Sequence, residues 1–381
     1  MISTDTLQKA VTAGIITATQ RDRLVALERI GPSQDEDDAG EENLRLIGGG
    51  NDLFVTVGTI LLSAGVYFVL STLFAGSVVP IAALMAVSAW LVAEIVTRQH
   101  RMKLASTVLS LIFMVSVVTL LATLAQQWFR LEMPDTIWQV AALRGDVAPA
   151  GYLLFGGAIL AAVLYFLRFR VPILAGIVAI SATCLVFLQT ALLLYDGVTT
   201  GAVVPPSLEE LPQMLRASLY MPLICGLVVF GVGVLLDLRD RNRQTIWSDC
   251  AFWLHVVSAP MLVHPLFILA TGRDVAFGRI EPDTTATILL VALIASFVYI
   301  ALAIDRRSLL APTLAYFGSL GIYYLMHSAA NTTGIPPFAL ILLAVGTLVI
   351  FFGAGWQRIR RLIIGTTLPT SVLNRLPPIK A

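Results

Sequence analysis

Two histidines and two prolines lie in one apolar stretch of the chain, SDCAFWLHVVSAPMLVHPLF, which covers residues 248–267. Histidine can ligate a metal or exchange a proton near neutral pH, so His255 and His264 are the first candidates for chemistry. On one helix they lie at different depths and on opposite faces, unless Pro260 or Pro265 turns the chain between them. A metal shared by this pair is therefore not expected, and only His264 is a candidate site.

Two further polar residues are expected at the depth of His264. Gln189 and His327 each follow about eighteen residues of an apolar stretch that we expect to run in the same direction. If the three helices adjoin, Gln189, His264 and His327 would line an outward-facing polar cavity in which histidine protonation changes solute affinity. The competing interpretation is ordinary polar residues at helix ends. Haem ligation by His264 and His327 is geometrically conceivable, but we expect no cofactor.

Other patterns that carry chemistry are missing from the sequence. It contains no HExxH, GxSxG or GxGxxG motif and no P-loop lysine. The three cysteines, Cys184, Cys225 and Cys250, lie in apolar runs without CxxC spacing. The sequence therefore favours no disulfide framework, no metal site and no enzyme.

Composition indicates an integral membrane protein. Of the 381 residues, 57% are apolar and only 13% are charged, and apolar runs of about twenty residues recur. The net charge of +1 excludes a strongly basic nucleic-acid-binding protein. We predict an all-α, polytopic transmembrane helical bundle of about ten spans. The expected spans are 53–74, 77–96, 104–125, 148–167, 171–194, 219–238, 247–270, 284–304, 309–329 and 336–355.

The orientation follows from Lys and Arg, which resist translocation across a membrane. Fifteen of them fall in one set of connections and the tail, and five in the alternate set. We therefore expect a multi-pass protein of the bacterial inner membrane with both termini in the cytoplasm. The first residues, which show no basic leader before an apolar core, fit a cytoplasmic start.

The expected domains are four. Residues 1–34 form a cytoplasmic helical hairpin in which Gly14 ends one helix and Thr17 caps the next. Residues 35–50 form an acidic and glycine-containing linker. Residues 51–356 form the transmembrane helical domain. Residues 357–381 form a basic cytoplasmic tail on the lipid surface, as the arginines beside an apolar face indicate.

Several charged and aromatic residues are expected at the membrane surface. Glu94 precedes Arg98 by four residues, which predicts an ion pair near the inner end of a helix. Asp237 and Asp305 lie beside arginines and are interpreted as interfacial anchors in the same way. The other predicted membrane-interface anchors are Trp247, Trp356, Arg358, Arg360 and Arg361.

Glycines recur within the expected spans. They let neighbouring helices approach closely, and the alternative is that some of them permit a rocking motion in a transporter. The residues concerned are Gly58, Gly65, Gly226, Gly231, Gly233, Gly318 and Gly321.

Four stretches carry a resemblance to known sequences. AGIITATQRDRL and GGGNDLFVTVGTILLSAGVYFVL are similar to the N-terminal part of bacterial membrane proteins grouped as domain of unknown function family 2157. SDCAFWLHVVSAPMLVHPLF and GAGWQRIRRLIIGTTLP also resemble features of uncharacterised proteobacterial membrane proteins. The resemblance implies a bacterial inner-membrane protein without an assigned activity, and it assigns no functional residues.

Two classes of function fit these observations. The first is a permease or transporter-like protein for an unknown small solute, which the number of spans, the glycines and the prolines at 260, 265 and 312 favour. The second is a noncatalytic membrane scaffold or sensor whose N-terminal hairpin binds a cytoplasmic protein partner. In both, the lipid bilayer is a partner and nucleic acid is not.

Overall fold

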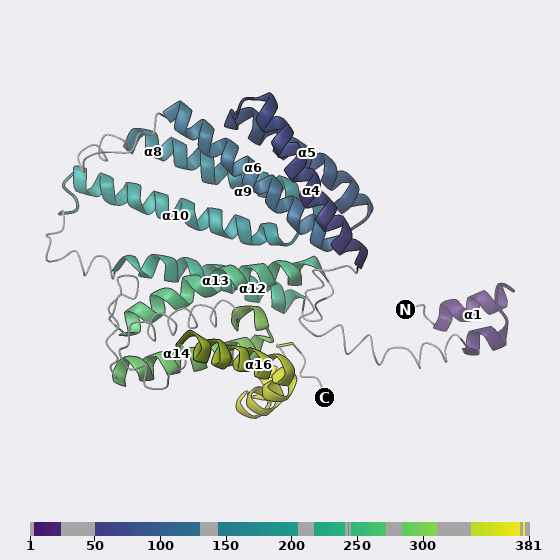
Figure 1. Cartoon of the computed structure of the whole chain (residues 1–381). Helices are drawn as coiled ribbons and strands as arrows, with labels where there is room; N and C mark the ends of the chain where they lie inside the picture. The colour runs from purple at the N-terminus through teal and green to yellow at the C-terminus, as the bar shows by residue number, and fades with distance from the viewer. Residues whose placement is uncertain are drawn as a thin grey trace.

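The computed structural model describes residues 4–23, 50–129, 144–204, 217–240, 243, 245–271, 284–310, 337–373 and 376–377. This part of the chain is helical throughout, apart from turns, and contains no strand (Figure 1). The all-α prediction is therefore confirmed for it.

Long apolar helices dominate the structure. They are α4 (Gly50–Leu73), α5 (Val78–Ala93), α6 (Lys103–Phe129), α9 (Gly157–Phe169), α10 (Ile173–Thr199), α12 (Tyr220–Arg239), α13 (Ile246–Thr271), α14 (Thr284–Ile304) and α16 (Pro337–Thr367). Shorter elements are α1 (Thr4–Thr12), α8 (Arg144–Gly151), the π-helical segments η1 (Glu94–Gln99) and η2 (Tyr152–Gly156), the 3₁₀ turn η4 (Arg307–Leu309) and α17 (Thr370–Leu373).

Seven helical segments in the described residues are long and apolar enough to cross a membrane. At about 1.5 Å per residue, 20 or more residues match a hydrocarbon core about 30 Å thick. The segments are 50–73, 78–99, 103–129, 145–169, 173–199, 220–239 and 246–266, and they coincide with the first seven predicted spans. Helices α14 and α16 cover the predicted spans 284–304 and 336–355, whereas 309–329 lies almost wholly outside the described residues.

The outer surfaces of these helices are apolar. On α4, Phe54 is 78% exposed and Phe68 is 68% exposed, and Leu91 on α5 and Leu164 on α9 are also exposed. Large apolar side chains over so wide a surface are unfavourable in water but suit a lipid environment. The chain is therefore a polytopic membrane protein.

One end of the bundle holds most of the charged contacts, and we call it the charged end. It comprises the turn from η1 to α6, the turn from α9 to α10, the connection from α12 to α13, and the end of α14. Glu94 and Arg168 join the first two of these places, and Arg243 and Asp305 join the last two. At the same end, Asp52 at the start of α4 accepts hydrogen bonds from the backbone N–H groups of Leu104 and Ala105 (3.0 and 3.2 Å).

The helices form two groups with separate cores (Figure 1). In the first group, α5, α6, α9 and α10 enclose a cluster of rings in which the centroid of Tyr165 lies 5.5 Å from Trp90 and 4.5 Å from Phe169. In the second group, α13, α14 and α16 bury Leu302 and Trp356, and α12 packs against the same cluster through Leu223 and Phe230. The two groups meet mainly where α10 contacts α13, and we call this contact the seam.

Glycines have different uses in different helices. A Cβ at Gly226 would lie 3.0 Å from Cβ of Met261, and one at Gly233 would lie 2.9 Å from Cε1 of His255, so both positions let α12 approach α13. At Gly58, Gly65 and Gly231 a Cβ would meet nothing within 4 Å. The predicted role in close packing is thus confirmed for part of the set. Gly318 and Gly321 lie outside the described residues.

The N-terminal segment begins as the sequence predicts. Helix α1 ends before Gly14, which has a left-handed φ of 73°. Thr17 and Gln20 form a capping box, because Oγ1 of Thr17 accepts from the N–H of Gln20 and the Gln20 side chain accepts from the N–H of Thr17 (3.3 and 2.8 Å). Residues 18–23 are helical and residues 24–49 lie outside the described part, so the complete hairpin stays a prediction.

The predicted boundary between span and tail near residue 356 does not coincide with a helix end. Helix α16 continues without a break from Pro337 to Thr367. Neither proline nor a left-handed residue interrupts the helix there, so backbone hydrogen bonding continues through the arginines. The first eleven residues of the expected tail therefore belong to the same helix.

Candidate functional site

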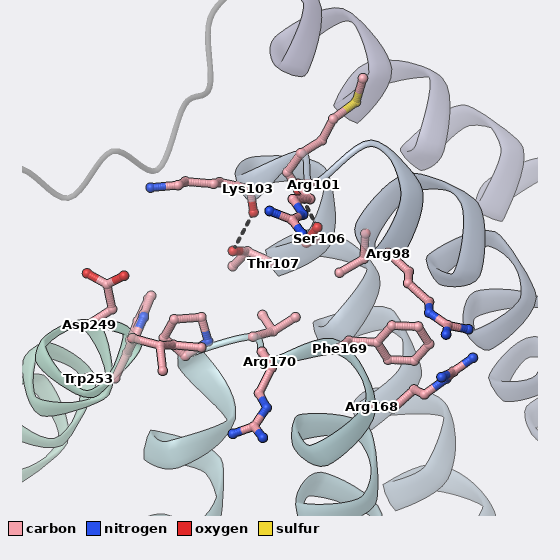
Figure 2. Close-up of a pocket in the computed structure, with 15 residues that line it drawn as sticks. Arg98, Arg101, Lys103, Ser106, Thr107, Arg168, Phe169, Arg170, Asp249 and Trp253 are labelled. Atoms are coloured by element: carbon pink, nitrogen blue, oxygen red, sulfur yellow. Dashed lines mark hydrogen bonds between the residues drawn. The ribbon is translucent and has the colours of Figure 1, made fainter. Parts of the chain in front are cut away.

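A pocket with a volume of about 480 Å³ opens at the charged end. Its walls come from the turn between η1 and α6, the turn between α9 and α10, and the first turns of α13 (Figure 2). A pocket of this size is in the range of small-molecule binding sites. The charged residues that line it are Arg98, Arg101, Lys103, Arg168, Arg170 and Asp249.

Glu94 pairs with two of these arginines. Its carboxylate accepts two hydrogen bonds from Arg168, at 2.8 Å from Nε and 2.9 Å from the terminal nitrogen, and one of 3.3 Å from Arg98. The predicted pair of Glu94 with Arg98 is confirmed. Arg168 is 74 residues further along the chain, so no local spacing indicates this stronger, bidentate contact.

The other three cations of the pocket have no hydrogen bond to a carboxylate within the described residues. Asp249 acts on Lys103 electrostatically, without a hydrogen bond between them. The guanidinium carbon of Arg170 lies 5.8 Å from the ring centroid of Phe166, which is a cation–π contact. Arg101 has neither a carboxylate nor an aromatic ring as a partner within the described residues. The pocket therefore holds more positive than negative charge.

Two of these arginines have an unusual backbone conformation. Arg101 and Arg170 both lie in the left-handed region, with φ of 50° and 57°. Helices often end on such a residue, but it is usually glycine, because a residue with a Cβ pays about 1 kcal/mol there. Both turns at the pocket thus carry a cation where glycine would be conformationally easier.

The π-helical segment η1 forms part of the same wall. Thr56, Thr107 and Thr183, in regular helices, each donate their hydroxyl to a carbonyl four residues earlier. Thr97 lies in η1, where the wider turn changes this geometry, and its Oγ1 has no hydrogen-bond partner in the described structure. Thr97 lines the pocket, so it offers a spare polar group close to the cations.

A buried ion pair lies deeper at the charged end. Asp237, near the end of α12, accepts a 3.0 Å hydrogen bond from Nε of Arg306 and a second bond from the terminal nitrogen of the same arginine. The terminal nitrogen also donates to the backbone carbonyl and hydroxyl oxygens of Ser248 at 3.0 and 2.9 Å. Asp237 is only 7% exposed, which corrects the prediction of an interfacial anchor: its partner is a distant arginine inside the protein.

His255 also belongs to this buried group. Its Nε2 lies 2.9 Å from Oδ2 of Asp237, and the residue is fully buried. The ring fits between α12 and α13 because position 233 is glycine, and Phe230 lies beside it at 5.2 Å between centroids. No local spacing in the sequence indicates this contact, because Asp237 is 18 residues earlier, on the preceding helix. We call Asp237, Ser248, His255 and Arg306 the buried charge cluster.

Asp305 forms a second group that ties α14 to α16. Nε1 of Trp356 donates a 2.6 Å hydrogen bond to Oδ1 of Asp305, and the guanidinium groups of Arg243 and Arg360 approach Oδ2 at 3.5 and 3.6 Å. Arg360 also donates to the backbone carbonyls of Leu302 and Pro377 at 2.9 and 2.7 Å. Asp305 is 3% exposed, so it too is a buried partner rather than an interfacial anchor.

These contacts also correct two of the predicted membrane-interface anchors. Trp356 and Arg360 are each 1% exposed, so their polar atoms bind protein groups and do not face lipid headgroups. Trp247 is 40% exposed, and Arg358 and Arg361 are exposed on the same helix as Trp356. For these three the anchor role stays a prediction.

The predicted outer cavity is not assembled by any contact in the described residues. Gln189, on α10, accepts a hydrogen bond from the hydroxyl of Tyr152 in η2. His264, on α13, is half-buried and lies in a helix that continues through Pro260 and Pro265. His327 lies outside the described residues. The cavity therefore stays a prediction, and the charged end offers the better-defined site.

The chain matches no protein-family model, no curated protein and no solved structure. The resemblance to domain of unknown function family 2157 accordingly stays a prediction. The function has to be argued from the pocket and the arrangement of the helices.

Proposed function

We propose that the chain is a permease or transporter-like protein for a small solute, located in a bacterial inner membrane with both termini in the cytoplasm. One observation carries the proposal: two helix groups with separate cores meet along one seam, and the pocket opens at the charged end of that seam. Transporters commonly move one helix group against another around a site between them.

Helices α10 and α13 are in contact at Gly176, directly beyond the pocket, and a separate apolar pocket of about 430 Å³ lies beside this contact between α9, α10, α12 and α13. Trp253 lines the pocket and contacts Gly176 of α10, where a Cβ would lie 3.6 Å from Cβ of Trp253. One helical turn further, the same Cβ would lie 3.2 Å from Cγ2 of Val257. A solute in the pocket would therefore need α10 and α13 to separate before it could pass. The proposed motion is the opening of this contact.

A disulfide across the seam tests the proposed motion. Cysteines would replace Gly176 and Val257, which face each other across the seam, since a Cβ at Gly176 would lie 3.2 Å from Cγ2 of Val257. In the same chain Cys184, Cys225 and Cys250 are replaced by alanine. The full-length protein is reconstituted in vesicles and offered an isotope-labelled extract of bacterial small molecules, and retained solutes are identified by mass spectrometry. We expect accumulation in the reduced protein, its loss on oxidation, and its recovery with reductant.

The matched control places a disulfide inside one helix group. Cysteines at Gly226 and Met261 link α12 to α13, which share the second group, so oxidation of this pair should leave accumulation unchanged. Vesicles that retain no more solute than protein-free vesicles would overturn the proposal. So would accumulation that survives oxidation of the Gly176 and Val257 pair.

The alternative function is a membrane scaffold or sensor whose N-terminal hairpin binds a cytoplasmic protein. It is favoured by one observation: within the described residues, 4–23 bond only among themselves, which leaves this segment available to a partner. Under this alternative, deleting residues 1–42 abolishes the cellular phenotype of the protein while solute accumulation is absent. Under transport, the same deletion leaves accumulation intact, and replacing His264 or His327 changes its pH dependence.

A further inference from the structure

We propose that the pocket at the charged end binds a phosphate group, carried either by a soluble phosphorylated molecule or by the headgroup of an anionic lipid. The inference deepens the proposed function, since phosphorylated solutes would be the substrate class of the transporter. The identification of a substrate, but not of the binding site, rests on the proposed function. Binding itself can be measured without transport.

The charges of the pocket favour an anion with more than one negative charge. Five cations line it, and the carboxylates closest to them are Glu94 and Asp249. A third carboxylate, Asp52, accepts from the N–H groups of the two residues after Lys103, and the five cations still outnumber the three carboxylates. Glu94 is occupied by Arg98 and Arg168, and the described residues supply Arg101 and Arg170 with no hydrogen-bonded carboxylate. A lone carboxylate ligand would leave this excess only partly balanced. A phosphate carries up to two negative charges near neutral pH and offers three or more acceptor oxygens.

Donors of the right kind come from different walls of the pocket. Arg101 and Lys103 come from one turn and Arg170 from the other, and Thr97 adds a hydroxyl without a partner in the described structure. Guanidinium groups match the geometry of phosphate oxygens, and lysine acts as a point charge. In Figure 2 the three cationic side chains extend in different directions around the pocket. Their flexible stems allow them to turn toward one anion.

Because both arginines have a left-handed backbone, their role in binding can be tested by substitutions that do not strain the fold. A positive charge at this end of the bundle does not require a left-handed residue, yet Arg101 and Arg170 occupy positions where glycine is conformationally favoured. The substitutions Arg101→Gly and Arg170→Gly therefore remove the charge while relieving backbone strain. Loss of binding in these variants cannot be assigned to a strained backbone.

The experiment compares a pocket variant with a control of equal charge. The pocket variant carries Arg101→Gly and Arg170→Gly. The control carries Arg23→Gln and Arg239→Gln, which are exposed arginines of the N-terminal segment and of α12 that do not line the pocket. The full-length proteins are titrated with inorganic phosphate in detergent by calorimetry. In a second arm they are extracted from vesicles of phosphatidylcholine with one fifth phosphatidylglycerol, and the retained phosphatidylglycerol is counted by native mass spectrometry.

Two outcomes support the inference, and they distinguish a soluble phosphorylated ligand from a lipid headgroup. Phosphate binding that weakens about tenfold or more in the pocket variant, and not in the control, indicates a soluble phosphorylated ligand. Retained phosphatidylglycerol that is lost only in the pocket variant, without phosphate binding, indicates a lipid headgroup. If the pocket variant and the control behave alike in both arms, the inference is wrong.

The two proposals fail in different measurements. Phosphate binding without solute accumulation in the vesicle assay would refute transport and leave the pocket assignment standing. Accumulation of uncharged or cationic solutes, with both binding arms negative, would refute the phosphate site and leave transport standing.

Discussion

Arg306 and Asp237 form a buried ion pair between positions 69 residues apart, with Nε of the arginine 3.0 Å from Oδ2 of the aspartate. Their side chains are 3% and 7% exposed, and the pair connects the end of α14 to the end of α12. Removing a charge from water is costly unless its partner is retained, so each residue depends on the other. This pair therefore helps to fix the arrangement of the second helix group.

The dependence predicts a strongly coupled pair of substitutions. Asp237→Asn or Arg306→Gln alone should each lower the free energy of unfolding by about 3–5 kcal/mol, because each breaks a buried, hydrogen-bonded ion pair. The double variant should lose little more than one single variant. The measurement is reversible unfolding of the four proteins in the same detergent. Additive losses would show that the pair is not coupled.

Gly233 and Gly231 give a second prediction, in one helix. Gly233→Ala places a methyl group 2.9 Å from Cε1 of His255, and this overpacking should destabilise the protein by about 1–3 kcal/mol. Gly231→Ala meets nothing within 4 Å, so it should be neutral or stabilising by up to about 1 kcal/mol. The same unfolding assay compares them. In a His255→Ala background, Gly233→Ala should lower the free energy of unfolding by less. An equal loss in both backgrounds would refute the clash.

Arg243 and Arg101 share a left-handed backbone but differ in their contacts. The side chain of Arg243 is buried, and its guanidinium donates to the backbone carbonyl of Asp305 at 2.6 Å and approaches the carboxylate of the same residue. Arg243→Gly should therefore destabilise the protein, because the lost bonds to a buried acceptor outweigh about 1 kcal/mol of relieved strain. Arg101→Gly should be neutral or stabilising. Equal melting temperatures for the two variants would contradict this account.

Local features of the chain were readable from the sequence, whereas contacts between helices were not. Apolar runs predicted the seven membrane-crossing segments to within a few residues, since the thickness of the bilayer sets their length. The pair of Glu94 and Arg98 followed from four-residue spacing on one helix. Gly14 and Thr17 likewise mark a helix end and a helix start by their own backbone chemistry.

The buried charges show why the rest was not predicted. Asp237 has arginines close by in the sequence, which favours an interfacial pair, yet its partners are His255 and Arg306 from other helices. Which face of α12 meets α13 depends on packing across the bundle, and one sequence does not give the rotation of each helix. For Trp356 and Arg360 the same ambiguity separates a lipid-facing anchor from a buried side chain.

The most direct test of the account is the side of the membrane on which the charged end lies. Single cysteines replace Arg101, at the charged end, or Val204, which is exposed beyond the other end of α10, in the chain without native cysteines. A membrane-impermeant maleimide is applied to intact cells and to inverted membrane vesicles. We predict that the cysteine at position 204 reacts in intact cells and the one at position 101 only in inverted vesicles. Reaction of the cysteine at position 101 in intact cells would contradict the cytoplasmic placement of the pocket.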